Sequence, residues 1–170
     1  VSGQKPIKMD ALRKLYENLG FQNITTYLQS GNVVFTCNAQ DQKKLEQILS
    51  QQIAEVFGFE VPVIVLTNDK LIQVIDNNPF LEDTDKDVNF LHVTFLSTIP
   101  NHHDFKIIED KKQNGEEIVL IDDAVYLYCP NGYGRTKLTN NFLEAKLKVV
   151  ATTRNWKTTN ELLKITEQIH

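Results

Sequence analysis

The sequence is poor in cysteine, and this excludes two classes of small protein. Its 170 residues include only Cys37 and Cys129. Two cysteines so far apart have no metal-ligand spacing and are too few for a disulfide scaffold. The pattern predicts two small, partly buried thiols in a reducing cytoplasm, and no metal site.

Long hydrophobic runs are also missing. No apolar stretch approaches the ~20 residues that a membrane-spanning helix needs, and no basic-then-apolar leader opens the sequence. Apolar residues make up 41% of the chain and charged residues 24%, as is typical of globular proteins. We expect a cytoplasmic protein without membrane contact, and the sequence indicates no cofactor.

Arginine is the scarcest charged residue, and its placement is uneven. Of three arginines, Arg135 and Arg154 both lie in the stretch 131–156, each beside small or hydroxylated residues. Residues 131–170 hold 7 Lys and Arg against 3 Asp and Glu, whereas residues 1–130 hold 11 against 19. This asymmetry predicts an anionic partner for the basic region; the alternative is that the region docks on its own acidic body.

Hydrophobic periodicity predicts an order of helices and strands. The expected helices are about 9–19, 45–57, 69–76, 103–112, 140–148 and 157–169, and the expected strands are 24–28, 33–36, 61–66, 88–96, 118–121 and 124–129. With one more strand before the first helix, the first half would read βαββαβ, which is the ferredoxin-like plait. The second half has the same order without its last strand.

We therefore predict an α+β fold, a duplicated ferredoxin-like plait with antiparallel sheets and helices packed on one face. The expected parts are a first half at 1–80, a second half at 81–150, and a C-terminal helix at 151–170 that packs on the body. The polar, acidic stretch 77–87 is the expected boundary between the halves.

Three segments resemble a known family. Residues 27–35, YLQSGNVVF, look like the YIQSGNVVF core of the bacterial domain-of-unknown-function family 1697. Residues 132–139, GYGRTKLT, followed by residues 151–156, ATTRNW, are similar to its C-terminal signature, and the helix at 9–21 matches its first helix. The resemblance implies a cytoplasmic bacterial α/β-plait protein with no established activity. It also implies an apolar strand before the first helix, so we expect that the native protein has a further N-terminal strand.

The loop at 131–137 has the composition of an anion site. Gly132 and Gly134 let the backbone approach a ligand, and successive N–H groups in such turns can form an anion nest. Arg135 offers a planar fork to phosphate or carboxylate, and Lys137 adds a second charge. The P-loop pattern is absent, and a tight strand-to-helix turn with solvated charges is the alternative.

The segment 152–156 is the expected second half of this site, between two helices. Thr153 or Asn155 can cap the last helix, Arg154 lies beside that terminus, and Trp156 either packs in the core or stacks on a flat ligand. The expected ligand-binding residues are Gly132, Tyr133, Gly134, Arg135, Thr136, Lys137, Thr153, Arg154, Asn155 and Trp156, with Gln29, Ser30 and Asn32 as a rim.

Three other patterns are weaker evidence for a functional site. Residues 83–87 begin like a calcium loop, but Val88 and Thr94 stand where Gly and Glu are needed, so we predict a solvated acidic linker. Aromatic residues at Phe90, Tyr126 and Tyr128 could stack bases, but the RNP1 pattern is missing. His92 and the other histidines show no metal-ligand spacing.

We therefore predict a two-lobed plait protein that binds a small anionic, phosphate-bearing ligand. A nucleic-acid-binding module and a purely structural or interaction protein are the alternatives. No pattern supplies a general base or a covalent nucleophile, so the sequence leaves open whether any reaction is catalysed.

Overall fold

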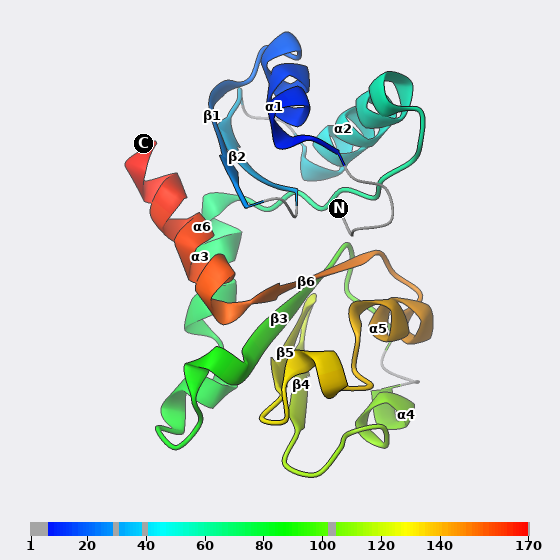
Figure 1. The fold of residues 1–170 in the computed structure, drawn as a ribbon, viewed down its shortest axis with the longest axis vertical. Helices are drawn as coiled ribbons and strands as arrows, with labels where there is room; N and C mark the ends of the chain where they lie inside the picture. Colours follow the sequence, from blue (N-terminus) through cyan, green and yellow to red (C-terminus); the bar gives the residue numbers. More distant parts are fainter. Residues whose placement is uncertain (1–6, 29–30, 39–40, 102–104, 170) are drawn as a thin grey trace. The chain divides into compact units, whose positions relative to one another are not determined.

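The computed structural model describes residues 7–28, 31–38, 41–101 and 105–169. Along the chain it contains α1 (Met9–Asn18), β1 (Gln22–Tyr27), β2 (Asn32–Thr36), α2 (Gln42–Phe57), α3 (Asn68–Asp76), η1 (Pro79–Glu82), η2 (Val88–Phe90), β3 (Leu91–Leu96), α4 (Phe105–Glu109), β4 (Glu117–Ile121), β5 (Ala124–Tyr128), η4 (Tyr133–Arg135), α5 (Asn140–Leu147), β6 (Ala151–Asn155) and α6 (Trp156–Gln168), where η marks a 3-10 helix (Figure 1). The fold is α+β, as predicted, with two antiparallel sheets. No helix in the described ranges is long and apolar enough to cross a bilayer.

The chain divides into two compact units. Unit 1 comprises the residues up to Leu71 together with those from Glu161 onward, and unit 2 comprises Ile72–Asn160. Helices α3 and α6 each begin in one unit and end in the other. The boundary that the sequence suggested in the polar stretch 77–87 stays a prediction.

Unit 1 is built from a hairpin and two amphipathic helices. Strands β1 and β2 pair antiparallel, with Thr26 opposite Val33. Helix α2 ends at Gly58, whose φ of 82° is a conformation that glycine adopts without strain. The buried residues that form the unit 1 core are Ile7, Met9, Leu12, Leu15, Tyr16, Ile24, Leu49 and Ile53.

Residues 61–66, which were expected to form a strand, are not part of either sheet. Their alternating valines do pack against the unit 1 core, but the backbone bonds to side chains of α2 instead of to a neighbouring strand. Val65 N donates to Glu46 Oε2 at 2.8 Å, and the Ser50 hydroxyl donates to Val61 O at 3.1 Å. The alternation predicted the buried face correctly, and the prediction of a strand was wrong because these bonds replace a sheet ladder.

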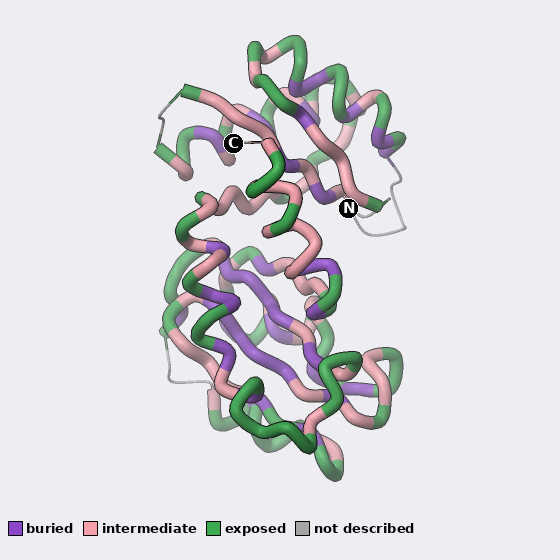
Figure 2. The backbone as a smooth tube through the Cα atoms, turned by 90° about the vertical axis from the view of Figure 1, so that its left-hand side faces the viewer, coloured by how far each residue is buried: buried purple, intermediate pink, exposed green. Residues whose placement is uncertain are grey.

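Unit 2 contains a four-stranded antiparallel sheet in the order β4-β5-β3-β6. Central strand β3 pairs with β5 on one side and β6 on the other, so His92 lies opposite both Leu127 and Asn155. Figure 2 shows the central strands buried along most of their length. The sequence placed the segment 152–156 between two helices, and it does lie between α5 and α6, but no strand was predicted where residues 151–155 form edge strand β6. The sequence conceals this strand because its threonines, arginine and asparagine show no apolar alternation.

The two faces of this sheet are covered by different helices. Leu96, Val125 and Leu127 pack on one face against buried residues of α4 and α5. On the other face, the Tyr126 hydroxyl donates to Val74 O of α3 at 2.7 Å. Burial, with smaller contributions from two nearby aspartates, raises the pKa of Tyr126 to about 12, so its hydroxyl remains a donor at neutral pH.

This hydroxyl gives a direct test of how α3 is attached to the sheet. Because Tyr126 is 1% exposed, Tyr126→Phe leaves the Val74 carbonyl without this donor and should lower the free energy of unfolding by about 1–2 kcal/mol. Urea denaturation measures the change. Tyr27→Phe, in half-buried β1, is the matched control and should change stability less. Equal stabilities of Tyr126→Phe and wild type would contradict this attachment.

Candidate functional site

The segment after β5 is a defined turn. Gly132 N donates to Cys129 O at 3.0 Å, and Arg135 N donates to Gly132 O at 3.1 Å. Gly132 has φ 97° and ψ 140°, a conformation that residues with a Cβ rarely adopt. The backbone conformation at position 132 therefore requires glycine, as the composition of the loop suggested.

Tyr133 fixes this turn to the unit 2 sheet. Its hydroxyl oxygen accepts a hydrogen bond from Asn140 N at 3.0 Å. Its ring stacks on the His92 ring, with centroids 4.5 Å apart and planes 22° from parallel. Burial raises the pKa of Tyr133, and hydrogen bonds with Thr153 and Asn140 offset part of this rise. Burial also lowers the pKa of His92, which favours its neutral form at neutral pH.

Asn140 connects the turn to strand β6. Its Nδ2 donates to Ala151 O at 3.1 Å, and its Oδ1 accepts from the Thr153 hydroxyl at 2.9 Å. The Thr153 and Thr94 hydroxyl oxygens are 2.7 Å apart, and Thr94 is fully buried. We call Thr94, Tyr133, Asn140 and Thr153 the Asn140 network. Two of the predicted site residues, Tyr133 and Thr153, are thus brought together.

Arg154 lies on the other face of the sheet. Successive side chains of a strand point to opposite faces, so Arg154 faces away from the Asn140 network that Thr153 joins. It is half-buried and donates to Thr152 Oγ1 at 2.8 Å and to Thr153 O at 2.9 Å. Desolvation lowers its pKa.

The other predicted residues fall into exposed and structural groups. Arg135 and Lys137 are exposed, whereas Thr136 is 7% exposed and accepts a hydrogen bond from Leu138 N at 3.1 Å. Asn155 accepts from Thr158 N at 2.8 Å at the start of α6. Trp156 is 8% exposed, which agrees with core packing and not with stacking on a ligand.

The predicted rim belongs to unit 1. Gln29 and Ser30 lie outside the described residues. Asn32 is 6% exposed, and its Nδ2 donates to Tyr27 O at 3.0 Å across the β1–β2 hairpin. Its amide therefore has a structural partner.

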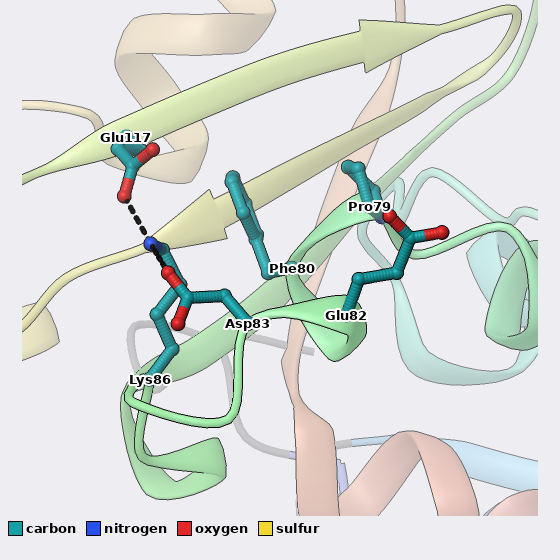
Figure 3. A pocket seen from close by; sticks show the side chains of 6 residues that line it. All are labelled: Pro79, Phe80, Glu82, Asp83, Lys86 and Glu117. Carbon is teal, nitrogen blue, oxygen red and sulfur yellow. Dashed lines mark hydrogen bonds and ion pairs between the residues drawn. The ribbon is translucent and has the colours of Figure 1, made fainter.

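Sequence reasoning missed a charged cluster in unit 2, at an open pocket of about 520 Å³ (Figure 3). Lys86 Nζ lies 2.8 Å from Asp83 Oδ2 and 2.7 Å from Glu117 Oε2. The same ammonium is 5.1 Å from the centroid of the Tyr128 ring and 5.9 Å from that of Phe80. The stretch 83–87 is thus an anchored segment, and the expectation of a wholly solvated linker was wrong for Lys86. No local pattern reveals this, because Glu117 is distant in the chain.

The ion pairs shift the pKa values of Lys86 and Asp83, and each shift favours the charged form of its group. Hydrogen bonds to Asp83 and Glu117 raise the pKa of Lys86, and the hydrogen bond from Lys86 is the main cause that lowers the pKa of Asp83. Lys86 thus lines the pocket together with its two carboxylate partners. Its clear role is to attach the segment 83–87 to the start of β4.

We call the ion pairs of Lys86 with Asp83 and Glu117 the Lys86 clamp. Measuring protein stability as a function of pH tests it. Lys86→Gln should lower the melting temperature between about pH 5 and pH 10, where the Asp83 carboxylate and the Lys86 ammonium are both charged. Because the pKa of Asp83 is lowered in the folded state, the advantage of wild type should disappear as the pH falls below about 4. Lys164→Gln, which removes an exposed lysine 3.2 Å from Glu161, is the control. An advantage that does not vary with pH would contradict the clamp.

Comparisons with known proteins address the family and the fold. A solved structure of a conserved bacterial protein from Streptococcus pneumoniae is similar, with 20% sequence identity, a TM-score of 0.70, and coverage of 97% of this chain and 92% of that chain. At this identity the likeness shows the fold alone. No curated protein matches the chain. The sequence profile described as "Protein of unknown function (DUF1697)" matches residues 1–126. Since this match spans most of the sequence, the chain belongs to the DUF1697 family.

Proposed function

We propose that unit 2 binds a small phosphate-bearing anion at the loop 132–137. The observation that carries this proposal is the pairing of two exposed cations, Arg135 and Lys137, with a turn whose backbone is fixed by hydrogen bonds. Neither cation takes part in an ion pair found among the described residues. The Arg135 fork can bind two phosphate oxygens at once, and Lys137 can neutralise a further charge.

The surface above the loop backbone is open to a ligand. Among the described residues, no atom outside the neighbouring residues lies within 4 Å of the position that a Cβ would take at Gly132 or Gly134. The N–H groups at the start of a 3-10 turn have no acceptor within the turn, and here these belong to Tyr133 and Gly134. Such groups can donate to an anion that approaches the glycines.

The Asn140 network supports this proposal by reducing the cost of ordering the loop on binding. A loop that is already fixed loses less conformational freedom when a ligand binds. Tyr133 and Thr153 therefore act as supports of the site, while Arg135 and Lys137 supply the charge. Arg154, Asn155 and Trp156 are outside this narrower site because their contacts serve the sheet, the start of α6 and the core. No catalytic step is proposed.

A thermal-shift screen tests the proposal with inorganic phosphate, nucleotides, sugar phosphates and dicarboxylates. A ligand at about a hundred times its Kd stabilises a protein by about 2.7 kcal/mol, so a melting-temperature shift of several degrees is expected for wild type. Arg135→Gln should abolish most of the shift. Arg13→Gln is the matched control, because Arg13 is an exposed arginine of α1, 3.5 Å from Glu17. The proposal fails if wild type and Arg135→Gln respond equally, or if no phosphate compound stabilises wild type.

Arg154 separates the binding role from the structural alternative. Arg154→Met removes the bonds to Thr152 and Thr153 and should lower the free energy of unfolding by about 1–2 kcal/mol. The phosphate-induced shift should remain. Denaturation and thermal-shift measurements on the same protein check both statements. Loss of the shift with unchanged stability would return Arg154 to the site.

For the fold, we infer that unit 2 is a ferredoxin-like plait. Its order β3-α4-β4-β5-α5-β6 and its antiparallel sheet order β4-β5-β3-β6 support this inference. In unit 1 the order α1-β1-β2-α2 is followed by the extended segment 61–66, so duplication of the plait stays a prediction. The loop 132–137 then lies between the third strand of the plait and its second helix.

A further inference from the structure

Helices α4 and α5 form one layer over a face of the unit 2 sheet (Figure 1). Ile108 of α4 and Leu143 of α5 are fully buried in a common core, which directs the polar side of each helix outward. The turn after α4 is joined to the loop by a hydrogen bond from Asn131 Nδ2 to Asn114 O at 3.0 Å. These contacts place α4, α5 and the loop on one continuous part of unit 2.

The outer surface of this part carries an excess of positive charge. We call its exposed cations the basic layer, and they are Lys106, Lys111, Lys112, Arg135, Lys137, Lys146 and Lys148. None of them takes part in an ion pair found among the residues that the structure describes.

Carboxylates in the same segments are fewer, and most of them are engaged. Glu109 and Asp110 are exposed on α4 and its C-terminal turn. Glu116 is 4% exposed, and its Oε1 accepts from Gln113 N at 2.7 Å. Glu144 is half-buried, and its Oε2 accepts from Ala151 N at 2.8 Å. Glu117, the residue after Glu116, is exposed but lies 2.7 Å from Lys86. Among the described residues of this part, seven exposed cations therefore face two exposed carboxylates without an ion pair, in a protein of net charge −4.

We propose that the basic layer binds the phosphate backbone of nucleic acid without reading its sequence. Closely spaced phosphates are complementary to cations distributed over two helices and a loop, and such binding draws its affinity from charge and counterion release. Base stacking is not part of this binding. Tyr126 is 1% exposed, and the Tyr128 ring is already in contact with Lys86.

The composition of the layer favours nucleic acid over an acidic protein. Stable protein interfaces are centred on aromatic or apolar side chains that become buried. Neither Phe105 of α4 nor Phe142 of α5 is exposed, and Ile107 is the large apolar side chain that the two helices do expose, at 46%. The apolar stripes of both helices are used in the core, so they are not available for insertion into a membrane surface.

The test measures binding of a labelled oligouridine and of a labelled DNA duplex by fluorescence anisotropy at several salt concentrations. The variant is Lys111→Gln, Lys112→Gln and Lys146→Gln together, which leaves Arg135 and Lys137 intact. The control is Lys8→Gln, Lys14→Gln and Lys44→Gln together, which removes three exposed lysines from unit 1. Both variants lose the same formal charge, so non-specific attraction changes equally.

Wild type and the unit 1 control should bind at least one nucleic acid with a steep dependence on salt. The α4–α5 variant should bind about tenfold more weakly, and the slope of log K against log salt should be smaller by about 2, because three phosphate contacts contribute about 0.7 each. Comparing oligouridine with the duplex shows which form is preferred. The phosphate-induced thermal shift should survive in this variant, so the two proposals can fail separately.

Three results would overturn the inference. The first is that neither nucleic acid binds at low salt. The second is that the two variants lose affinity equally, since the attraction would then come from net charge alone. The third is that polyglutamate or phosphatidylserine vesicles bind as tightly as the nucleic acids and are equally weakened in the α4–α5 variant, which would assign the layer to an acidic protein or a membrane surface.

Discussion

The position of the loop after β5 in unit 2 depends on hydrogen bonds of the Asn140 backbone N–H and the Asn140 side-chain amide. The N–H is bonded to the Tyr133 hydroxyl, and the side-chain amide is bonded to Ala151 O and to the Thr153 hydroxyl. These three bonds join the loop after β5, the start of α5 and the edge strand β6. Polar groups half-buried at such a junction must all find partners, since each one left unpaired costs free energy. The position of the loop is therefore a consequence of packing in unit 2, and not of the loop sequence alone.

This constraint separates residues that can meet a ligand from residues that shape the protein. Strand β6 directs Thr153 to the Asn140 network and Arg154 to the opposite face, so adjacent residues have different roles. Asn155 accepts a bond from Thr158 N, and Trp156 enters the core. Arg135 and Lys137 remain at the surface, where a charged ligand can reach them.

The sequence allowed most elements to be predicted, because their hydrophobic periodicity is strong. Helix α1 and the hairpin of β1 and β2 lie close to their expected positions. Two strand assignments failed for opposite reasons. The segment 61–66 alternates but bonds to side chains of α2, whereas β6 lacks alternation but pairs with β3 in register. Pairing depends on distant neighbours, which a local pattern does not contain.

Part of the site was also predictable. The glycines and Arg135 stand out by composition, and Gly132 does adopt a backbone conformation that requires glycine. The roles of His92 and Thr94 were missed, although polar residues two apart in an otherwise apolar strand are a signal of a polar network on one face. The Lys86 clamp had no such signal, because its partner Glu117 becomes a neighbour only when the sheet forms.

Amide hydrogen exchange in Tyr133→Phe measures most directly whether the Asn140 network positions the loop. This change keeps the ring that stacks on His92 and removes the hydroxyl that accepts from Asn140 N. Exchange at the Asn140 amide should accelerate by about fivefold, as the loss of roughly 1 kcal/mol predicts. Amides in the centre of β3 should remain protected. An Asn140 amide that exchanges as slowly in Tyr133→Phe as in wild type would show that the loop is fixed in some other way.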